Sequence, residues 1–356
     1  MKILRKIFIL KVIIIFFITN IFILNVNASL TLHANQGDIV NVGVLFANLD
    51  NPFWRLIDKS LNDMQNKTEN KVRFTSYDGK NNISTQFEQI DSLIRSNTDL
   101  LVIKLADSKE DSIRTVIDKA IAKNIPVIFL NVDPLVSSKF SKYYANNIVF
   151  MAEDFIKPAA LQGKLIAEVW NANKQNIDKN QDNILQYIML SGERGNPIAE
   201  ARTQYSIAAI NTAGITTQQL AQGYAKWDRE IARQLISQII LQYDDRIEAI
   251  IANSDSMAIG AVEALQSYGY NNGNKSKNIL VVGFDGLVEA KDLIDKGFMT
   301  GTIAQDPTTV SEAIYTVGMN LVNNRNPLEN TNYKLSNSGI VLEFPHYEYI
   351  NKSNVS

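Results

Sequence analysis

The sequence contains no cysteine and only two histidines among its 356 residues. Without cysteine there can be no disulfide, no thiol nucleophile, no thiolate metal site and no lipid-anchored N-terminal cysteine. His33 and His346 stand near the two ends of the chain that follows the N-terminal apolar segment, which disfavours a histidine-based catalytic or zinc centre. Hydrolases and metalloenzymes are therefore poor hypotheses for this chain.

An excess of basic charge is also missing. The formal net charge is −2, and removing the four cations of the N-terminal segment described next takes it to −6. A mildly acidic chain has no positive field for nucleic acid, so we expect no nucleic-acid partner. The glycine patterns G-x-G-x-x-G and G-x-x-x-x-G-K-[ST] are absent as well, which argues against a dinucleotide or a nucleoside triphosphate as ligand.

Residues 1–28 have the pattern of a secretory signal peptide. An apolar run, Val12–Leu24, precedes the small-residue cleavage site Val26-Asn27-Ala28, and the charged start consists of Lys2, Arg5, Lys6 and Lys11. The run is shorter than the roughly 20 residues that span a bilayer, although an uncleaved anchor stays open. We expect an exported protein that is kept in the periplasm, since it has no cysteine for a lipid anchor.

From residue 40 onward, short β-branched runs alternate with amphipathic segments of helical period, as in βαβ units around a parallel sheet. A first set of expected strands comprises Ile39–Phe46, Val72–Ser76, Leu100–Lys104 and Pro126–Asn131. The helices expected between them run from about Phe53 to Met64, over Ile83–Arg95 and over Asp111–Lys123. These segments predict one complete α/β lobe.

A second set follows the polar stretch Asn171–Asn183. Its expected strands are Ile184–Leu190, Thr216–Leu220, Ala249–Ala252 and Asn278–Phe284, and its expected helices are Ala199–Asn211, Asp228–Leu241 and Asp255–Tyr268. The remaining segments, Thr300–Ala304, Thr309–Asn323 and Gly339–Ile350, are too small for a third domain and are expected to return to the first lobe and then to the second. The sequence predicts an α/β fold of two Rossmann-like lobes with parallel sheets, joined by a multi-crossing hinge, with ligands at the carboxyl ends of the strands.

Several short motifs occur in the order seen in bacterial periplasmic galactose/glucose-binding proteins. They are Val42-Gly43-Val44, Asp50-Asn51-Pro52-Phe53-Trp54, Phe129 to Pro134, Gly192 to Pro197 with Ala199 to Thr203, Trp227-Asp228, Ile251 to Asp255 with Gly260 to Leu265, and Gly283-Phe284-Asp285. Each motif alone is weak, but the ordered set is specific, and the chain resembles this family from about residue 40 to residue 345.

The resemblance implies a type I periplasmic binding protein fold with residues 38–147 plus 305–340 in the N-terminal lobe and residues 148–304 plus 341–356 in the C-terminal lobe. It also implies a monomeric, non-enzymatic protein that captures a monosaccharide and delivers it to the membrane subunits of an ABC importer. A chemoreceptor is a further implied partner.

Carried over by position, the resemblance places the sugar between two aromatic walls, Phe53 and Trp227. A pyranose has apolar C–H patches on its faces and hydroxyls at its rim, so flat apolar walls and a polar edge suit it. The polar edge would comprise Asn51, Asn131, Asn196, Arg202, Ser254, Asp285, Gln305 and Asp255. Phe53 could instead belong to a core, and each polar residue could instead be a helix cap or a structural hydrogen bond, capping being favoured for Ser254, Asn196 and Asp255.

The sequence departs from the family pattern at several of these positions. Asn51 stands where the family has an acid, Asn196 where it has a histidine, Ile198 where it has an aspartate, and Ser254 and Gln305 where it has asparagines. A buried hydroxyl that loses its partner costs roughly 1–3 kcal/mol, so the sugar itself stays open. A pentose, a deoxy sugar or another hexose are alternatives to galactose or glucose.

A second predicted site is a structural Ca²⁺ loop. Asp178, Asn180 and Asp182 place oxygen side chains at alternate positions, followed by the carbonyl of Ile184 and the side chain of Gln186, as in an EF-hand loop. The twelfth position is Met189, which cannot ligate, and the resemblance supplies Glu248 as the distant acid. The alternative is a solvated linker in an asparagine-rich chain.

Two further hypotheses keep the fold but change the function. The inducer domain of a transcription repressor would carry a basic helix-turn-helix segment, which this sequence lacks. An enzyme acting on sugars would need paired carboxylates facing across the cleft, for which Asp285 and Asp255 are the candidates.

Overall fold

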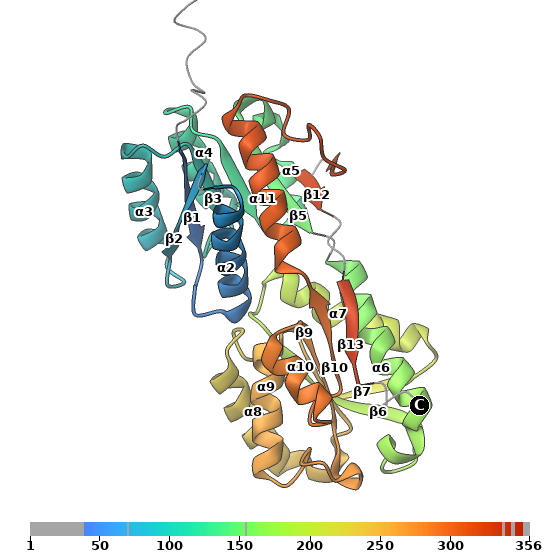
Figure 1. Ribbon diagram of the computed structural model, residues 1–356. Helices are drawn as coiled ribbons and strands as arrows, with labels where there is room; N and C mark the ends of the chain where they lie inside the picture. The colour runs from blue at the N-terminus through green and yellow to red at the C-terminus, as the bar shows by residue number, and fades with distance from the viewer. Residues whose placement is uncertain (1–38, 70, 154, 337–338, 343–345, 352–356) are drawn as a thin grey trace, which may run out of the picture.

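The computed structural model describes residues 39–351 except 70, 154, 337–338 and 343–345, and shows two α/β lobes arranged end to end (Figure 1). The predicted signal peptide and His33 lie outside the described residues. No helix in the described ranges is both long enough and apolar enough to cross a membrane.

The N-terminal lobe is built on a sheet with the strand order β11-β12-β5-β4-β3-β1-β2. Its neighbouring strands are parallel except for β11 and β12, which are antiparallel. The strands are β1 (Val40–Phe46), β2 (Val72–Asp78), β3 (Leu100–Ile103), β4 (Val127–Leu130), β5 (Ile148–Glu153), β11 (Lys334–Ser336) and β12 (Gly339–Leu342), and the helices are α2 (Pro52–Lys67), α3 (Ile83–Arg95), α4 (Glu110–Ile121), α5 (Pro134–Ser138) and α11 (Pro307–Val322).

Both faces of this sheet are covered, and this explains its nearly continuous apolar strands. Successive side chains of a strand point to opposite faces. Val44 therefore packs with residues of α2 and α11, whereas its neighbour Leu45 packs with residues of α3 and α4.

The C-terminal lobe repeats this design around a sheet with the strand order β13-β10-β9-β8-β6-β7. Only β13 runs antiparallel to its neighbour there. The elements are α6 (Ile156–Ile177), β6 (Ile184–Ser191), α7 (Pro197–Thr212), β7 (Thr216–Tyr224), α8 (Arg229–Tyr243), β8 (Ala249–Ala252), α9 (Asp255–Ser267), β9 (Leu280–Asp285), α10 (Val288–Asp295), β10 (Gly301–Gln305) and β13 (His346–Ile350). Residues of α8, α9 and α10 pack in one core of this lobe, and residues of α6 and α7 pack in the other.

The chain changes lobes between β5 and α6, between β10 and α11, and between β12 and β13. Three predicted lobe boundaries need correction. Strand β5 pairs with β4, so residues 148–153 still belong to the N-terminal lobe, and β12 pairs with β5, so residues 341 and 342 do as well. Gln305 ends β10 and pairs with β13, so it belongs to the C-terminal lobe. The multi-crossing arrangement itself agrees with the prediction.

The sequence did not predict β5, α5, α6, α10 or β11. The polar stretch Asn171–Asn183, which we took to separate the two lobes, begins inside α6, and α6 continues to Ile177 with non-helical backbone angles at Asn173. The end of this helix could not be predicted from hydrophobic periodicity, because most of its side chains are exposed and polar. Val169 and Trp170 in the preceding turn are buried.

Candidate functional site

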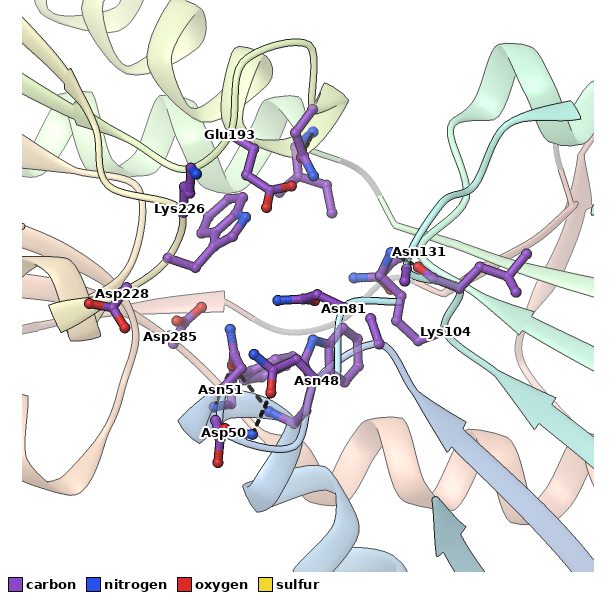
Figure 2. Close-up of a pocket in the computed structure, with 18 of the residues that line it drawn as sticks. Asn48, Asp50, Asn51, Asn81, Lys104, Asn131, Glu193, Lys226, Asp228 and Asp285 are labelled. Atoms are coloured by element: carbon purple, nitrogen blue, oxygen red, sulfur yellow. Dashed lines mark hydrogen bonds between the residues drawn. The ribbon is translucent and has the colours of Figure 1, made fainter. Parts of the chain in front are cut away.

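A cleft that is partly open to solvent lies between the carboxyl ends of the strands of the two lobes. Figure 2 shows Asn48, Asn51, Asn81 and Asn131 of one lobe across the cleft from residues of the other, such as Glu193. The cleft is the place at which the fold brings polar side chains from both lobes together.

Most of the predicted sugar-contacting residues line this single cleft. They are Asn51, Phe53, Asn131, Asn196, Arg202, Trp227, Asp285 and Gln305, and Ile198 lines it as well. Ser254 does not line it: its hydroxyl accepts a hydrogen bond from the backbone N–H of Met257 at 3.4 Å and caps α9. Asp255 is also absent from the lining because it is fully buried in the core beneath.

The aromatic wall on the N-terminal lobe involves two rings. Phe53 is only 9% exposed and packs in the core of its lobe, while the half-buried Trp54 stands edge-on to it with ring centroids 5.3 Å apart. Both rings line the cleft, and Trp54 was not predicted. Phe53 therefore both packs in the core and lines the cleft, so the two predicted alternatives hold together.

The aromatic wall on the C-terminal lobe is Trp227, which lies against the backbone of Gly192. A Cβ atom at Gly192 would come within 2.3 Å of the indole ring, so only glycine leaves room for it. Lys226 and Trp227 both have positive φ angles, 51° and 63°, which L-residues with large side chains rarely adopt. This uncommon backbone turn brings the indole to the end of β7 and into the cleft lining.

An ion pair forms the floor of the cleft on the C-terminal lobe. Nη1 of Arg202 donates to the carbonyl of Asn253 at 2.6 Å and to Oδ1 of Asp285 at 3.4 Å, and the guanidinium stacks over the ring of Phe284. Nε2 of Gln305 donates to the same Asp285 oxygen at 3.2 Å. In the described part of the chain, the buried Oε1 of Gln305 has no hydrogen-bond partner, so it can accept from a ligand.

Burial raises the pKa of Asp285 to about 6. The charge of Arg202 and hydrogen bonds from Gln305, Arg202 and the backbone of Asp255 oppose this shift. The pKa of Asp255 is raised further, to about 8, by complete burial and by the charge of Asp285. Two neighbouring carboxyl groups thus sit in an environment that penalises their ionised forms.

The asparagines that open two helices serve as caps as well as lining the cleft. Oδ1 of Asn51 accepts from the backbone N–H of Phe53 at 2.9 Å, and Oδ1 of Asn196 accepts from that of Ile198 at 3.1 Å. The proline after each asparagine suits the first helical position. Capping was the predicted alternative for Asn196, and each side chain retains its NH₂ group as a donor.

The cleft contains further polar residues that the sequence analysis missed, namely Asn48, Asp50, Asn81, Lys104, Glu193, Lys226 and Asp228. Lys104 directly follows β3, beside the strand that leads to Asn131. The rule that parallel strands end at one edge could have identified Lys104. Asn81 lies on a turn beyond β2, where the sequence gives no comparable signal.

The predicted calcium loop folds back on itself. Oδ1 and Oδ2 of Asp178 accept from the backbone N–H groups of Asp182 and Asn183 at 3.1 and 3.0 Å, and Oδ2 of Asp182 accepts from Nε2 of Gln186 at 2.7 Å. Glu248, which is 1% exposed, accepts from the backbone N–H groups of Lys179 and Gln186 at 2.9 Å each. The distant glutamate therefore lies against the loop, as the resemblance implied.

The donor set of this loop fits a hard cation. Burial, together with the charges of Asp178 and Asp182, raises the pKa of Glu248 to about 7, and the buried Oε1 of Gln186 has no partner among the described residues. Calcium prefers such carboxylate, amide and carbonyl oxygens. Acidic side chains alone would not form this metal site, because no three His, Asp or Glu residues in the described ranges lie close enough together to hold a metal ion.

Comparisons with known proteins agree with the fold and with the two-lobed cleft. Residues 42–326 match a family described as periplasmic binding protein domain. The D-galactose/methyl-galactoside binding periplasmic protein MglB of Haemophilus influenzae is 33% identical over 318 residues, covering 88% of this chain and 90% of that protein. The ribose import binding protein RbsB of Bacillus subtilis is 27% identical over 278 residues, covering 76% of this chain and 78% of that protein.

Solved structures share the fold over almost their whole length. A periplasmic solute-binding protein of an ABC transporter from Actinobacillus succinogenes, with bound D-allose, has a TM-score of 0.71 at 20% identity and covers 88% of this chain and 99% of its own. A solute-binding protein from Bacillus halodurans, with bound myo-inositol, has a TM-score of 0.70 at 20% identity and covers 90% of this chain and 98% of its own. At this level of identity the likeness concerns the fold.

The raised pKa of Asp285 predicts a pH dependence of stability. Its pKa in the folded protein is about 6, above the ordinary 3.8. Ionising Asp285 therefore costs the folded state free energy, and this cost is absent below about pH 4 and complete above about pH 6. The unliganded protein should lose the corresponding stability, about 3 kcal/mol for about two pKa units, as the pH rises through this window.

Thermal denaturation between pH 4 and pH 7 measures this dependence. Asp285→Asn should flatten the curve of Tm against pH, whereas Asp292→Asn at an exposed position of α10 should leave its slope unchanged. Equal slopes for wild type and Asp285→Asn would contradict the assignment.

Proposed function

Since the chain belongs to the periplasmic binding protein family, we propose that it is a substrate-binding protein that captures a monosaccharide and delivers it to the membrane subunits of an ABC importer. The observation that carries this proposal is one cleft lined by aromatic rings and by fixed hydrogen-bonding groups from both lobes. MglB of Haemophilus influenzae is named as a periplasmic protein, and we place this protein in the periplasm too.

The chemistry of the cleft suits a sugar ring. Trp227 on one lobe and Phe53 with Trp54 on the other supply flat apolar surfaces for the C–H faces of a pyranose. Arg202 can donate to two adjacent hydroxyls, Asp285 can accept hydroxyl protons, and Oε1 of Gln305 offers an acceptor with no protein donor in the described ranges. We expect the C–H faces and the rim hydroxyls of one sugar ring to match these groups together.

Binding to both lobes also provides the mechanism of closure. A ligand shifts a two-lobed protein toward its closed form only through contacts that the open form lacks. A hexose has roughly a dozen heavy atoms, and the ceiling of about 1.5 kcal/mol per atom easily accommodates the about 8 kcal/mol of a micromolar complex. We propose a monomer, with a chemoreceptor as a second partner of the closed form.

The proposal includes binding without turnover. A glycosidase needs two carboxyl groups facing the substrate. Of the candidate pair, only Asp285 lines the cleft, while both carboxyl oxygens of Asp255 accept hydrogen bonds inside the core. The family consists of binding proteins, and Asp255 is held in the core, away from any glycosidic bond in the cleft.

The sugar that we propose is a galactose- or glucose-like hexose, with a pentose or a deoxy sugar as the alternative. Ile198 supports the alternative because its apolar side chain lines the cleft in the first turn of α7, where the resembling family has an aspartate. A hydroxyl facing Ile198 would lose a partner at a cost of roughly 1–3 kcal/mol. A methyl group or a hydrogen at that place would lose nothing.

Thermal-shift measurements of the mature protein against D-glucose, D-galactose, D-fucose, D-xylose, D-ribose and D-allose test both parts of this proposal. A sugar that binds only the folded protein at about 100 times its Kd should raise stability by about 2.7 kcal/mol. Arg202→Ala should abolish the shift, since it removes a donor and leaves Asp285 buried without its ion pair. Sucrose serves as the control for unspecific stabilisation.

A shift with any of these monosaccharides supports the function, and no shift with all of them contradicts it. If Ile198 selects a deoxy sugar, D-fucose should bind more tightly than D-galactose and Ile198→Asp should reverse the order. An unchanged order would refute the role of Ile198 alone.

We further propose that the loop of Asp178, Asn180, Asp182, Ile184 and Gln186, with Glu248, holds a structural Ca²⁺ ion. The ion would link the end of α6 to the strands β6 and β8. It would also neutralise carboxylates whose negative charges repel one another. The partnerless Oε1 of Gln186 supports the proposal, because rotating its amide would direct this oxygen toward the acids.

The calcium proposal predicts that EGTA lowers Tm and that added CaCl₂ restores it. Saturation at about 100 times the Kd corresponds to about 2.7 kcal/mol. Glu248→Gln should remove the difference between the two conditions, while Glu200→Gln on the exposed side of α7 should retain it. Identical melting curves of wild type in EGTA and in CaCl₂, with no calcium found by elemental analysis, would disprove the site.

A further inference from the structure

Asp255 forms a buried hydrogen-bonded anchor directly behind the cleft. Its Oδ2 accepts from the backbone N–H groups of Gly286 and Leu287 at 2.8 Å each, and its Oδ1 accepts from the hydroxyl of Thr302 at 2.6 Å. The side chain is fully buried and projects from the first turn of α9. One carboxylate thereby joins α9, the turn after β9 and strand β10.

Strand β9 leaves room for this carboxylate by having glycine at position 283. A Cβ atom at Gly283 would lie 2.2 Å from Oδ1 of Asp255, well inside van der Waals contact. Since Gly283 lies within a buried strand, where glycine weakens the strand, its use indicates that the close approach of Asp255 is built into the fold.

The turn that Asp255 anchors carries the cleft carboxylate. Asp285 has a φ angle of 118° and Gly286 one of 79°, so the backbone turns sharply where the strand ends. Glycine tolerates such angles, but an aspartate at 118° is strained and persists only where its surroundings fix it. The hydrogen bonds that the backbone N–H groups of Gly286 and Leu287 donate to Asp255 provide this restraint.

We propose that Asp255 is a positioning residue for ligand recognition, because it holds the turn at residues 285–287 so that the Asp285 carboxylate faces Arg202, Gln305 and the cleft. Figure 2 shows Asp285 on the C-terminal side of the cleft, where it would meet the ligand. The inference rests on the proposed function in one respect only, namely that Asp285 contacts the sugar.

The two carboxyl groups are also coupled electrostatically. The charge of Asp285 raises the pKa of Asp255, and the backbone of Asp255 hydrogen-bonds to the Asp285 carboxyl group. The other groups that face this pair are Arg202 on α7, Gln305 and Thr302 on β10, and Lys291 on α10, whose side chain lies next to Gly286. Asp285 has the lower pKa of the two and ionises first, while Asp255 is still neutral, so the negative charge of Asp285 then opposes the ionisation of Asp255.

The anchor is tested by comparing two Thr→Val variants and Asp255→Ala. Thr302→Val removes the donor to Asp255, while Thr300→Val removes a buried hydroxyl just before β10 that accepts from the backbone N–H of Val281. Kd is measured by calorimetry with whichever of D-galactose, D-glucose, D-allose and D-ribose wild type binds most tightly.

Asp255→Ala should weaken binding by about tenfold or more, and Thr302→Val by about threefold. Thr300→Val should lower Tm but leave Kd within about twofold of wild type. If Asp255→Ala binds as tightly as wild type, or if Thr300→Val weakens binding as much as Thr302→Val, the positioning role is refuted.

Asp255→Asn provides a readout that a merely structural role would not move. Its amide oxygen can accept from Gly286 and Leu287 while its NH₂ group donates to Thr302, so the anchor is kept and the charge is removed. Asp255 has a pKa of about 8 and is therefore neutral where Asp285 ionises, near pH 6, so Asp255→Asn should bind as tightly as wild type with the same pH midpoint, in contrast to Asp255→Ala. Equally weak binding by Asp255→Asn and Asp255→Ala would contradict the anchor.

A crystal structure of ligand-free Asp255→Ala separates this inference from the proposed function. A changed backbone at residues 285–287 supports the anchor even if wild type binds none of the sugars, in which case only the proposed function fails. An unchanged turn with Asp285 still facing Arg202 overturns the inference even if wild type binds sugar.

Discussion

The cleft depends on one constraint, which is that parallel sheets covered on both faces bury the side chains of their central strands. Leu45 and Val44 are adjacent in β1 and are both fully buried, because each faces a different helical layer. Polar groups that must meet a ligand can then stand only where strands end. Both lobes turn these ends toward the same gap.

Burying charge beside this gap carries a cost that the protein offsets with several partners. Arg202 is stacked on Phe284, donates to a backbone carbonyl and contacts Asp285, and Gln305 donates to the same carboxylate. A buried charge is tolerated only when it is paired and hydrogen-bonded. The result is a set of donors and acceptors that is fixed before a ligand arrives, which reduces the ordering cost of binding.

The sequence was sufficient for the periodic parts of the fold and for side chains at strand ends. The helix Ile83–Arg95 has the predicted bounds, and Arg202 and Asp285 meet as expected although 83 residues separate them. The order of the motifs made it possible to predict that Arg202 and Asp285 lie in one site. This prediction came from the family resemblance, because the spacing of the two residues in the sequence does not show that they are close in space. The lobe boundaries failed since strand β5 pairs with the first sheet, and no local pattern indicates which sheet a buried strand joins.

Other features could not be read from the sequence for physical reasons. Trp54 and Phe53 are adjacent on a helix, and their shared place in the lining depends on how α2 meets the sheet. The anchor at Asp255 joins residues from three separate segments, and a residue in a capping motif gives no sign that its side chain reaches Thr302. Ser254 illustrates the converse, since the capping alternative holds there and the residue is absent from the cleft lining.

A crystal structure of the mature protein grown with D-galactose tests the central claim most directly. The account predicts a sugar ring between Trp227 and the pair of Phe53 and Trp54, with its hydroxyls within hydrogen-bond distance of Arg202 and Asp285. A sugar held by one lobe alone, or bound instead in the second cavity of the C-terminal lobe beside Asn173 and Asn278, would contradict it.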